Sequence, residues 1–493
     1  MNYIGISNGF HDAGITVLDT IGNILFAGHS ERYSKQKHDK ELSPLLLTDA
    51  LSYLTTKEYE LHYYERPWLT SLRQIRAGQP VDLRTIKNRI GKKIVNQFNT
   101  KKITTHAHHL SHAAAGFQTS PYEKATVVII DAIGEFDTIT IWNAYYDMFG
   151  VAQYDKLWSM QYPDSIGLFY SAMTERVGLR PLDEEYILMG MAAYGQPIHL
   201  NEIIDNIVDG KDILSFKQNL HIGVDKDFLK DADHMNIASS SQHLVEQMIA
   251  RVMSKARIIG SSSNLVYGGG VALNCLANRL LGNFNEHIWI MPNPGDCGSS
   301  LGAAALGYGK QLNWKNAYLG YNISGPYPVD KLLNELSTNG IVGVASGRAE
   351  FGPRALGNRS LLADPRGNTI KDKVNEIKRR QKFRPFAPVI LEEFAHQYFT
   401  MPNHWDNSRY MQVISTCRNP ELFPAIVHHD GTSRVQTVPK DGSGIRQLLE
   451  AWHEETDCPM LLNTSLNIRG EPMVNDRKDA DRFEQLYGVK VYS

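Results

Sequence analysis

The chain has 493 residues, which is too long for one hydrophobic core and long enough for two or three domains. Its 42% hydrophobic and 21% charged residues are ordinary for a soluble globular protein. A formal charge of −2 gives no global electrostatic reason to bind duplex nucleic acid or an anionic membrane, so any acidic ligand must be met by local clusters.

The N-terminal part of the chain alternates strand and helix patterns. Apolar alternation predicts a meander of three strands: Tyr3–Ser7, Ile15–Leu18 and Ile24–Ala27. Two further strands run into Asp or Gly at their ends: Thr126–Asp131 and Leu265–Gly270. Helical patterns lie at Ser165–Val177 and His243–Lys255. The first roughly 310 residues are therefore predicted to form an α/β region of two lobes.

A second region follows a stretch rich in Pro, Gly and Asn, Leu312 to Asp330, which is typical of a linker. A strand at Ile341–Ala345 opens a unit of about 150 residues. Three more strand patterns follow in it: Pro388–Leu391, Tyr410–Ile414 and Met460–Leu462.

The cysteines and the N-terminal residues indicate in which cellular compartment the protein is expected. Four cysteines lie far apart without a CxxC pair, which argues against a disulfide framework and a thiolate zinc site: Cys275, Cys297, Cys417 and Cys458. The opening MNYIGIS lacks the basic and apolar regions of a signal peptide, and no apolar run reaches the roughly 20 residues of a bilayer span. We expect a cytoplasmic protein, not associated with a membrane.

The stretch from Arg73 to Lys102 is locally basic, with a single acidic residue, Asp82. Its nine cations are Arg73, Arg76, Arg84, Lys87, Arg89, Lys92, Lys93, Lys101 and Lys102. A solvated helix face is the usual explanation of such a run, and a lid over an anionic substrate is the alternative.

The motif HHLSHAAAG carries the strongest local signal. His108 and His112 stand four residues apart and share one face of a helix, about 6 Å from each other. Two neutral imidazoles so placed can hold a divalent ion, although a histidine-rich helix with satisfied side chains remains the alternative. Asp131 at a strand end and Asp296 in the turn NPGDCGSS could complete a shell of nitrogen and oxygen ligands, which suits iron or manganese. His109 is expected to pack or to support the ligands.

Two glycine motifs together describe a nucleotide cleft. Gly268, Gly269 and Gly270 follow an apolar strand and let the backbone approach a ligand, with Asn274 four residues further on. The turn at Gly295–Ser300 leads into the helical pattern LGAAALGYG, whose N-terminal amides suit phosphate.

The C-terminal region begins with a cluster of arginines in GRAEFGPRALGNRSLLADPR. Guanidinium groups bind phosphate and carboxylate through two parallel hydrogen bonds, which predicts an anion site. Arg354 and Arg384 are the strongest candidates because each lies in a turn sequence, FGPRALG or FRPFAP. The polar turn Asn463–Asn467 could bind a ligand or serve as a simple turn.

Taken in order, these motifs resemble the O-carbamoyltransferases of nodulation-factor and antibiotic biosynthesis, which are related to proteins that make threonylcarbamoyladenosine in tRNA. The resemblance spans nearly the whole chain. It rests on HDAG (11–14), ERYSKQKHD (31–39), HHLSHAAAGF (108–117), DAIGE (131–135), MGMAAYG (189–195), GGGVALN (268–274), GDCGSSLGAAL (from 296), EFGPRALGNRS (350–360), FRPFAP (383–388) and LNTSLN (462–467).

The resemblance implies an α/β protein with a two-lobed actin-like ATPase domain, followed by a smaller α/β domain that forms carbamoyl-adenylate. The expected boundaries are 1–320 for the transfer domain, with lobes of about 1–164 and 165–312, and 335–493 for the smaller domain. It further implies carbamoyl phosphate, ATP with Mg²⁺ and a small-molecule hydroxyl acceptor as substrates. Fe(II) is the expected metal, with Mn as the alternative, and a homodimer is compatible with the chain.

Residue by residue, the resemblance implies three groups of functional side chains. The metal would be held by His108, His112, Asp131 and Asp296. The transfer site would be lined by His11 and Lys37, where His11 could take the acceptor's proton or make a structural turn hydrogen bond. Carbamoyl-adenylate would be bound by Arg354, Lys378, Arg384, Arg434, Asn463 and Ser465.

One departure and two alternatives accompany the resemblance. Ile187 stands where relatives commonly have a lysine, so a phosphate contact there is absent or supplied elsewhere. A small-molecule kinase of actin-like fold is one alternative, although it does not explain the second domain. A partner protein in tRNA modification is the other. The acceptor is left open among a sugar, a natural product and a hydroxymethyl pyrimidine nucleotide.

Overall fold

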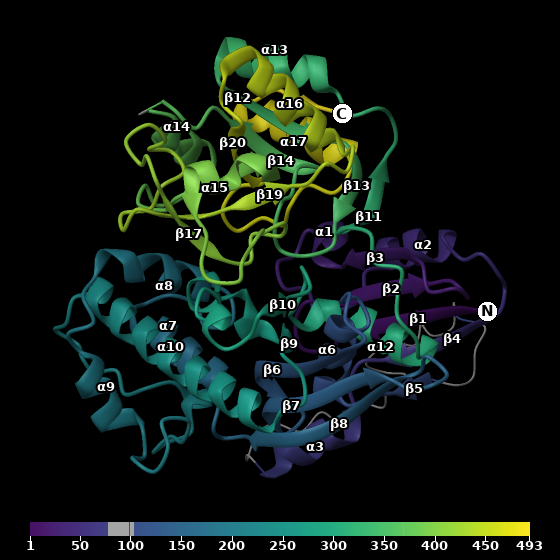
Figure 1. Ribbon diagram of the computed structural model, residues 1–493, viewed down its shortest axis with the longest axis vertical. Helices are drawn as coiled ribbons and strands as arrows, with labels where there is room; N and C mark the ends of the chain where they lie inside the picture. The colour runs from purple at the N-terminus through teal and green to yellow at the C-terminus, as the bar shows by residue number, and fades with distance from the viewer. Residues whose placement is uncertain (77–97, 99–102, 368) are drawn as a thin grey trace. The chain divides into compact units, whose positions relative to one another are not determined.

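The computed structural model describes residues 1–76, 98, 103–367 and 369–493, which form two compact units (Figure 1). Two ranges make up unit 1: Met1–Ser30 and His38–Lys315. Two ranges make up unit 2: Glu31–Lys37 and Asn316–Ser493. The short helix α1 (Glu31–Ser34) thus belongs to the C-terminal unit, where the Arg32 guanidinium donates to the carbonyl of Gly352 over 2.7 Å and Lys35 pairs with Asp479.

The first sheet of unit 1 has the strand order β3-β2-β1-β4-β5. Its strands are β1 (Asn2–Ser7), β2 (Gly14–Leu18), β3 (Ile24–His29), β4 (Tyr59–Tyr63) and β5 (Ile103–Thr105). The first three pair antiparallel, as the meander pattern predicted, whereas β4 and β5 run parallel to β1. Parallel neighbours require crossover connections, so helices cover the faces of this sheet.

The second sheet repeats this topology with the order β10-β9-β6-β7-β8. Its strands are β6 (Lys124–Gly134), β7 (Asp137–Tyr146), β8 (Ala152–Gln161), β9 (Asn264–Gly268) and β10 (His287–Trp289). Here β6, β7 and β8 form the antiparallel meander, and β9 and β10 run parallel to β6. The repeat confirms the two-lobed α/β fold. The second sheet already begins at β6, whereas the expected first lobe extended to about residue 164.

Two helices that position the candidate site pack against each other, one on the second sheet and one on the first. They are α6 (His108–Phe117) and α12 (Ser299–Tyr308). A Cβ on Gly302 of α12 would lie 1.7 Å from the carbonyl oxygen of Ser111, so only glycine permits this approach. The small residues of LGAAALG therefore bring the start of α12 next to the histidines of α6.

The other helices of unit 1 complete its layers. They are α2 (Pro44–Ser52), α3 (Pro67–Arg76), α7 (Ile166–Arg176), α8 (Glu185–Met191), α9 (Leu200–Ile207), α10 (His234–Ile259) and α11 (Cys275–Asn278). α7 and α10 overlap the two predicted helices, and α10 is longer than expected. Ser165 caps α7 by accepting the N–H of Leu168, and Asp233 caps α10.

Unit 2 contains a mixed six-stranded sheet with the order β19-β15-β20-β14-β12-β21. Its strands are β12 (Ile341–Ala345), β14 (Arg359–Ala363), β15 (Ala387–Leu391), β19 (Gln436–Val438), β20 (Met460–Ser465) and β21 (Val491–Tyr492). Its helices are α13 (Val329–Asn339), α14 (Ile370–Ile377), α15 (Ala395–Tyr398), α16 (Gly444–Thr456) and α17 (Arg477–Tyr487). Aliphatic residues of the sheet and Trp452 of α16 form its core.

Two predictions for this region were wrong in detail. The stretch Leu312 to Asp330 contains β11 (Tyr318–Ile323), which pairs with β13 (Gly347–Glu350) and so belongs to the folded unit. Its glycine and asparagine masked a short strand pattern. The run Tyr410–Ile414 mostly precedes a strand, because β17 is Ile414–Cys417, paired with β16 (Phe399–Thr400) and β18 (Thr432–Arg434).

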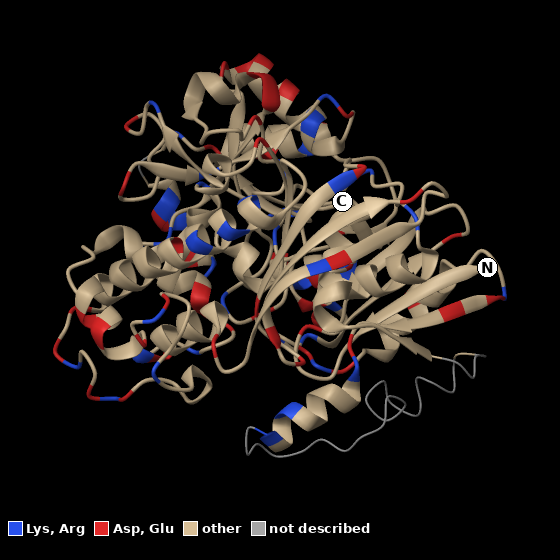
Figure 2. Cartoon of the chain, turned by 60° about the horizontal axis from the view of Figure 1, so that its bottom comes forward, with Lys and Arg blue, Asp and Glu red and all other residues tan. Residues whose placement is uncertain are grey.

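Charges of both signs are interspersed over the helices and loops in view in Figure 2. The predicted basic stretch falls mostly outside the described residues, namely at Arg84, Lys87, Arg89, Lys92, Lys93, Lys101 and Lys102. Of the two cations that are described, Arg76 is exposed at the end of α3. Arg73 is buried, with its guanidinium 5.8 Å from the ring centre of Tyr162. Arg73 therefore does not lie on a solvated helix face, and the alternative of a lid stays a prediction.

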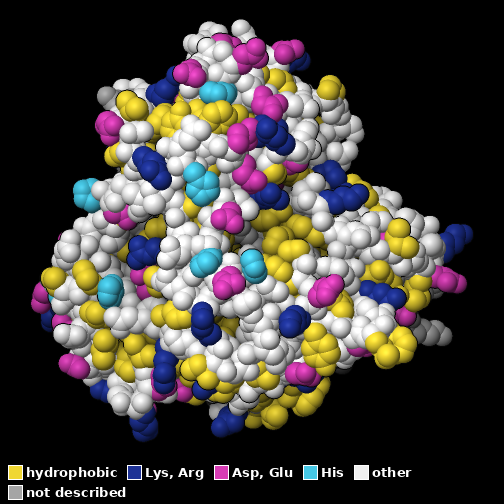
Figure 3. Space-filling view, viewed as in Figure 1, with side chains coloured by type: hydrophobic (Ala, Val, Ile, Leu, Met, Phe, Trp, Pro, Cys, Tyr) yellow, Lys and Arg dark blue, Asp and Glu magenta, His cyan; other side chains and the backbone are white. Residues whose placement is uncertain are grey.

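The exposed face of α3 is apolar, with Trp68, Leu72 and Ile75 at 64%, 49% and 59% exposure. Figure 3 shows apolar side chains at the lower edge of this view, where Figure 1 labels α3. The helix has only 10 residues, about half of a bilayer span. None of the helices within the described ranges combines the length and apolarity that crossing a membrane requires.

Candidate metal centre and anion site

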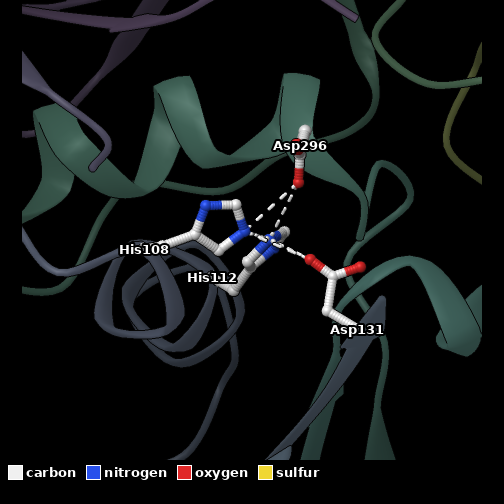
Figure 4. Close-up of side chains that lie close together, drawn as sticks. All are labelled: His108, His112, Asp131 and Asp296. Carbon is white, nitrogen blue, oxygen red and sulfur yellow. Dashed lines mark hydrogen bonds and ion pairs between the residues drawn. The ribbon is translucent and has the colours of Figure 1, made fainter. Parts of the chain in front are cut away.

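Four side chains converge in unit 1: His108 and His112 from α6, Asp131 from β6 and Asp296 from the turn before α12 (Figure 4). The two Nε2 atoms lie 3.1 Å apart, because residues four apart share one helix face. Oδ2 of Asp131 is 3.1 Å and 3.3 Å from these nitrogens, and Oδ1 of Asp296 is 3.3 Å from each. All four ligand atoms lie within 4.8 Å of one another.

The backbone fixes which oxygen Asp131 presents to the histidines. Oδ1 of Asp131 accepts the N–H of Ala132 over 2.9 Å and the N–H of Gly270 over 3.2 Å. Its Oδ2 is thereby turned toward the histidine pair. Second-sphere hydrogen bonds of this kind orient metal ligands and tune affinity.

Burial and charge compete at the cluster. Burial alone lowers the pKa of His108, but the charge of Asp296 and hydrogen bonds to Asp131 and Asp296 raise it well above the usual value. The pKa of His112 is also raised, since its hydrogen bonds to the two aspartates outweigh burial. Burial opposes ionisation of Asp131, yet its hydrogen bonds with both histidines hold its pKa well below the usual range. Without a metal, the two carboxylates thus favour the protonated form of the histidines.

The donor set fits a divalent metal. Two imidazole nitrogens and two carboxylate oxygens converge in a buried site, and this mixture suits iron or manganese. A cation at their centre would compete with protons for the imidazole nitrogens. The four residues named from sequence are therefore the ones that the structure brings together.

His11 lies beside this cluster in the loop between β1 and β2. Its Nε2 is 3.7 Å from Oδ2 of Asp296, and its Nδ1 is 2.9 Å from Oδ2 of Asp12. Burial lowers the pKa of His11, but the charge of Asp296, the hydrogen bond to Asp12 and the charge of Asp131 raise it to about 9. The ring is therefore held by one carboxylate and faces the cluster with its other nitrogen.

Lys37, expected beside His11, belongs to unit 2. There its positive charge helps to lower the pKa of Lys378, after burial and the charges of Arg380 and Arg384. Its role next to His11 would involve both units and stays a prediction.

The glycine turn after β9 packs on β6. A Cβ on Gly269, whose φ is +87°, would lie 2.2 Å from the carbonyl oxygen of Ile130, and the next residue, Gly270, supports Asp131. The Cβ of a residue at 268 would be 3.0 Å from the side chain of Ile129. The structure therefore gives this turn a role beside the candidate metal centre, and its nucleotide contact stays a prediction.

Asn274 is engaged inside the protein. Its Oδ1 accepts the N–H of Ala277, which caps α11, and its side-chain amide exchanges two hydrogen bonds with Gln242, at 3.0 Å and 3.1 Å. Gln242 in turn accepts from the hydroxyl of Tyr170. These contacts give Asn274 a structural role whether or not a nucleotide also reaches it.

In unit 2, Lys378 is buried among neutral oxygens. Its Nζ donates to the backbone carbonyls of Ser465 and Asn467, to Oγ of Ser465 over 3.2 Å and to Oδ1 of Asn467 over 3.1 Å. Burial, followed by the charges of Arg380, Arg384 and Lys37, holds its pKa well below the usual value. An anionic ligand bound here would offset the repulsion among these cations and favour the charged form of Lys378.

The loop that carries Arg354 is wrapped around a carboxylate. Oε1 of Glu350 accepts the backbone N–H groups of Leu356, Asn358 and Arg359 at 2.8, 2.9 and 3.2 Å. The side-chain amide of Asn463 donates to the carbonyl of Ala355 over 3.0 Å. This carbonyl and the N–H of Leu356 belong to the same peptide group and point in opposite directions. The backbone just after Arg354 is therefore held from both sides.

Two atoms of the expected anion site have no hydrogen-bond partner within the described residues: Oδ1 of Asn463 and Nε of Arg434. Both are buried atoms, and such atoms are normally satisfied by protein, water or ligand. Arg434 lies on β18 and Asn463 on β20, two strands of unit 2. Arg384 is half-buried and adds to the positive charge around Lys378.

Several side chains that organise these sites were not identified from the sequence. They are Asp12, His38, Asp183 and Glu350. All except Asp183 lie inside quoted motifs: HDAG, ERYSKQKHD and EFGPRALGNRS. The sequence shows that these residues are polar. It does not show which carboxylates hold a loop and which are solvated, because that depends on their hydrogen-bond partners in the folded chain. Ile187, at the expected lysine position, is 1% exposed and packs in the core.

Comparison with known proteins identifies two family regions in the chain. Residues 46–305 match the family model described as carbamoyltransferase N-terminus, and residues 333–492 match carbamoyltransferase C-terminus. A kinase alternative does not account for the second match.

Individual relatives agree. An uncharacterized protein of Synechocystis sp. is 32% identical over 97% of this chain and 93% of its own length. The nodulation protein NolNO of Sinorhizobium fredii is 28% identical over 97% of this chain and 77% of its own length. The 3'-hydroxymethylcephem-O-carbamoyltransferase of Amycolatopsis lactamdurans is 31% identical over 61% of this chain and 62% of that protein. The chain therefore belongs to the carbamoyltransferase family and is a carbamoyltransferase.

Proposed function

We propose that the protein is an ATP-dependent O-carbamoyltransferase that works in two half-reactions. In the first, carbamoyl phosphate, ATP and one water give carbamoyl-adenylate, phosphate and pyrophosphate. In the second, the carbamoyl group passes to a hydroxyl of a small molecule and AMP leaves. The acceptor belongs to one of three classes: a sugar, a natural product or a hydroxymethyl pyrimidine nucleotide.

The first half-reaction is assigned to unit 2. Carbamoyl phosphate and ATP are both polyanions, and Lys378, Arg354 and Arg384 supply positive charge that their phosphates require. Because the backbone just after Arg354 is clamped, binding a phosphate through this residue would order little additional backbone. Oδ1 of Asn463 is an unsatisfied acceptor that suits the N–H groups of a carbamoyl amide.

The second half-reaction is assigned to the metal centre of unit 1. His108, His112, Asp131 and Asp296 would hold Fe(II) or Mn(II), which when bound supplies a positive charge that stabilises a phosphate leaving group. His11 faces this centre through Nε2 and can take the proton of the acceptor hydroxyl there. A bound cation would neutralise the charges of Asp131 and Asp296, which are two causes of the raised pKa of His11. Metal binding would therefore favour the neutral form of His11.

The observation that carries this proposal is the convergence of two histidines and two aspartates, with the ring of His11 3.7 Å from one of the aspartates. The experiment is to incubate the purified protein with ATP, Mg²⁺, Fe(II) and carbamoyl phosphate and to measure pyrophosphate. We expect pyrophosphate only when carbamoyl phosphate is present. ADP as the nucleotide product would contradict adenylation.

The acceptor is found in the same incubation. A panel with members of the three acceptor classes is added, and mass spectrometry records the gain of one carbamoyl group. Omission of ATP is the matched control, because direct transfer from carbamoyl phosphate would persist without it.

A further inference from the structure

The carboxylate of Asp12 is shared by three histidines of unit 1. Its Oδ2 lies 2.9 Å from Nδ1 of His11, and its Oδ1 lies 3.3 Å from Nε2 of His29 and 3.0 Å from Nδ1 of His38. His11 also faces the candidate metal centre through its Nε2. The sequence motif HDAG therefore supplies both a ring and the group that holds it.

The contact to Asp12 decides which nitrogen of His11 is available. A carboxylate accepts a hydrogen bond, so Nδ1 of His11 carries the hydrogen that points to Asp12. In the neutral ring the lone pair is then on Nε2, the atom 3.7 Å from Asp296. The opposite tautomer would place an N–H toward the acceptor and could not take its proton.

Asp12 is linked to the second lobe through His38. His38 contacts Asp12 through Nδ1, and its Nε2 lies 2.9 Å from Oδ1 of Asp183, in the segment before α8. Oδ2 of Asp183 pairs with Arg180 over 2.7 Å. Asp12 also has a φ of +54°, a conformation that non-glycine residues adopt only when their surroundings hold them there.

We propose that Asp12 is the positioning residue of His11 in carbamoyl transfer, and that His38, itself held by Asp183 of the second lobe, holds Asp12 in place. The inference rests on the proposed function. During transfer the O–H bond of the acceptor breaks, its proton moves to Nε2 of His11, and the acceptor oxygen bonds to the carbamoyl carbon. The bond from that carbon to the AMP phosphate breaks, and AMP takes the electron pair. Asp12 keeps Nδ1–H bound and stabilises the imidazolium.

Two small nucleophiles used as acceptors can distinguish a role of Asp12 in positioning the base His11 from a general structural role of Asp12. Methanol must lose a proton to form methyl carbamate, whereas hydroxylamine attacks through a neutral nitrogen and forms hydroxyurea without a base. Asp12→Asn has nearly the same shape but no charge, and its amide can present an N–H to His11. We expect formation of methyl carbamate to fall roughly 10²-fold or more, as general-base catalysis is lost. Hydroxyurea formation, pyrophosphate release and metal content should stay within about threefold of the unmodified protein.

Matched variants complete the test. Asp19→Asn makes the same chemical change in the turn between β2 and β3, where Asp19 bonds only locally to Ile21 and Asn23, and should alter neither product. Asp183→Ala touches neither His11 nor Asp12 and should lower methyl carbamate formation about tenfold while sparing hydroxyurea. This variant keeps the proposal testable if Asp12→Asn does not fold.

The outcomes are distinct. Equal loss of both products in Asp12→Asn, or loss of neither, overturns the positioning role. Unchanged methyl carbamate formation in Asp183→Ala overturns the part played by the second lobe. If the unmodified protein releases no pyrophosphate, or releases it and forms neither product, the proposed function itself fails.

Discussion

The backbone N–H of Gly270 donates to Oδ1 of Asp131 over 3.2 Å and so joins the glycine turn after β9 to the candidate metal centre. The neighbouring Gly269 has a φ of +87°, and its missing side chain lets the turn approach the carbonyl of Ile130. A motif that resembles a nucleotide loop thus orients a candidate metal ligand.

Gly269→Ala should weaken metal binding, because its Cβ would lie 2.2 Å from the carbonyl oxygen of Ile130 and push the N–H of Gly270 away from Asp131. We expect roughly a tenfold rise in the Kd for Fe(II) or Mn(II), as is typical of lost second-sphere contacts. Gly150→Ala is the matched control, with a φ of +72° but no atom within 4 Å of the new Cβ. An equal change of Kd in both variants would point to a general loss of stability.

His108→Ala or His112→Ala should remove metal and carbamoyl transfer while the fold remains. Each substitution takes one of two ligands from a single helix face, and water cannot readily replace an imidazole there. Metal analysis should give less than about a tenth of the normal content. His109→Ala is the control on the same helix, since Nδ1 of His109 is bonded to the hydroxyl of Thr140 over 3.0 Å. Full metal occupancy in both ligand variants would refute the assignment.

Metal affinity should rise with pH. The pKa of His108 is well above its usual value and that of His112 is raised, so protonation of these rings competes with a cation more strongly than in a free imidazole. Each ring must lose its proton to bind a cation, so raising the pH removes a competitor and strengthens binding. Calorimetry in two buffers of different ionisation enthalpy should detect proton release. A Kd independent of pH between about 6 and 9 would contradict a site built on these imidazoles.

Arg354→Ala or Ser465→Ala should abolish pyrophosphate release that depends on carbamoyl phosphate, because unit 2 must bind both substrates before any transfer. Arg366→Ala is the matched control, since Arg366 is paired with Asp364 over 2.8 Å and is 39% exposed. His108→Ala should spare much of this release. Normal carbamoyl-adenylate formation in Arg354→Ala would show that the division of labour between the units is wrong.

The strands and helices that were predicted well are those with a clear local period. The meander at the N-terminus and the strand ending at Asp131 show apolar alternation, and β1, β2, β3 and β6 include those residues. β11 was missed because a six-residue strand with a central Gly and an Asn gives little alternation. The sequence pattern gives no sign that the two lobes share the same strand order. Strand order depends on connections between strands far apart in the chain, and local patterns do not reveal these.

The spacing of His108 and His112 by itself determined that two imidazoles would share a helix face, because helical periodicity is local. The sequence also marked Asp131 and Asp296 by their places at a strand end and in a glycine turn. Tertiary structure alone decided that these carboxylates meet the histidines, that Gly270 selects the oxygen Asp131 presents, and that Asp12 links His11 to His38 and Asp183. It also placed Lys37 in unit 2 and buried Arg73. Such contacts join residues far apart in the chain, and only the packing of sheets and helices fixes them.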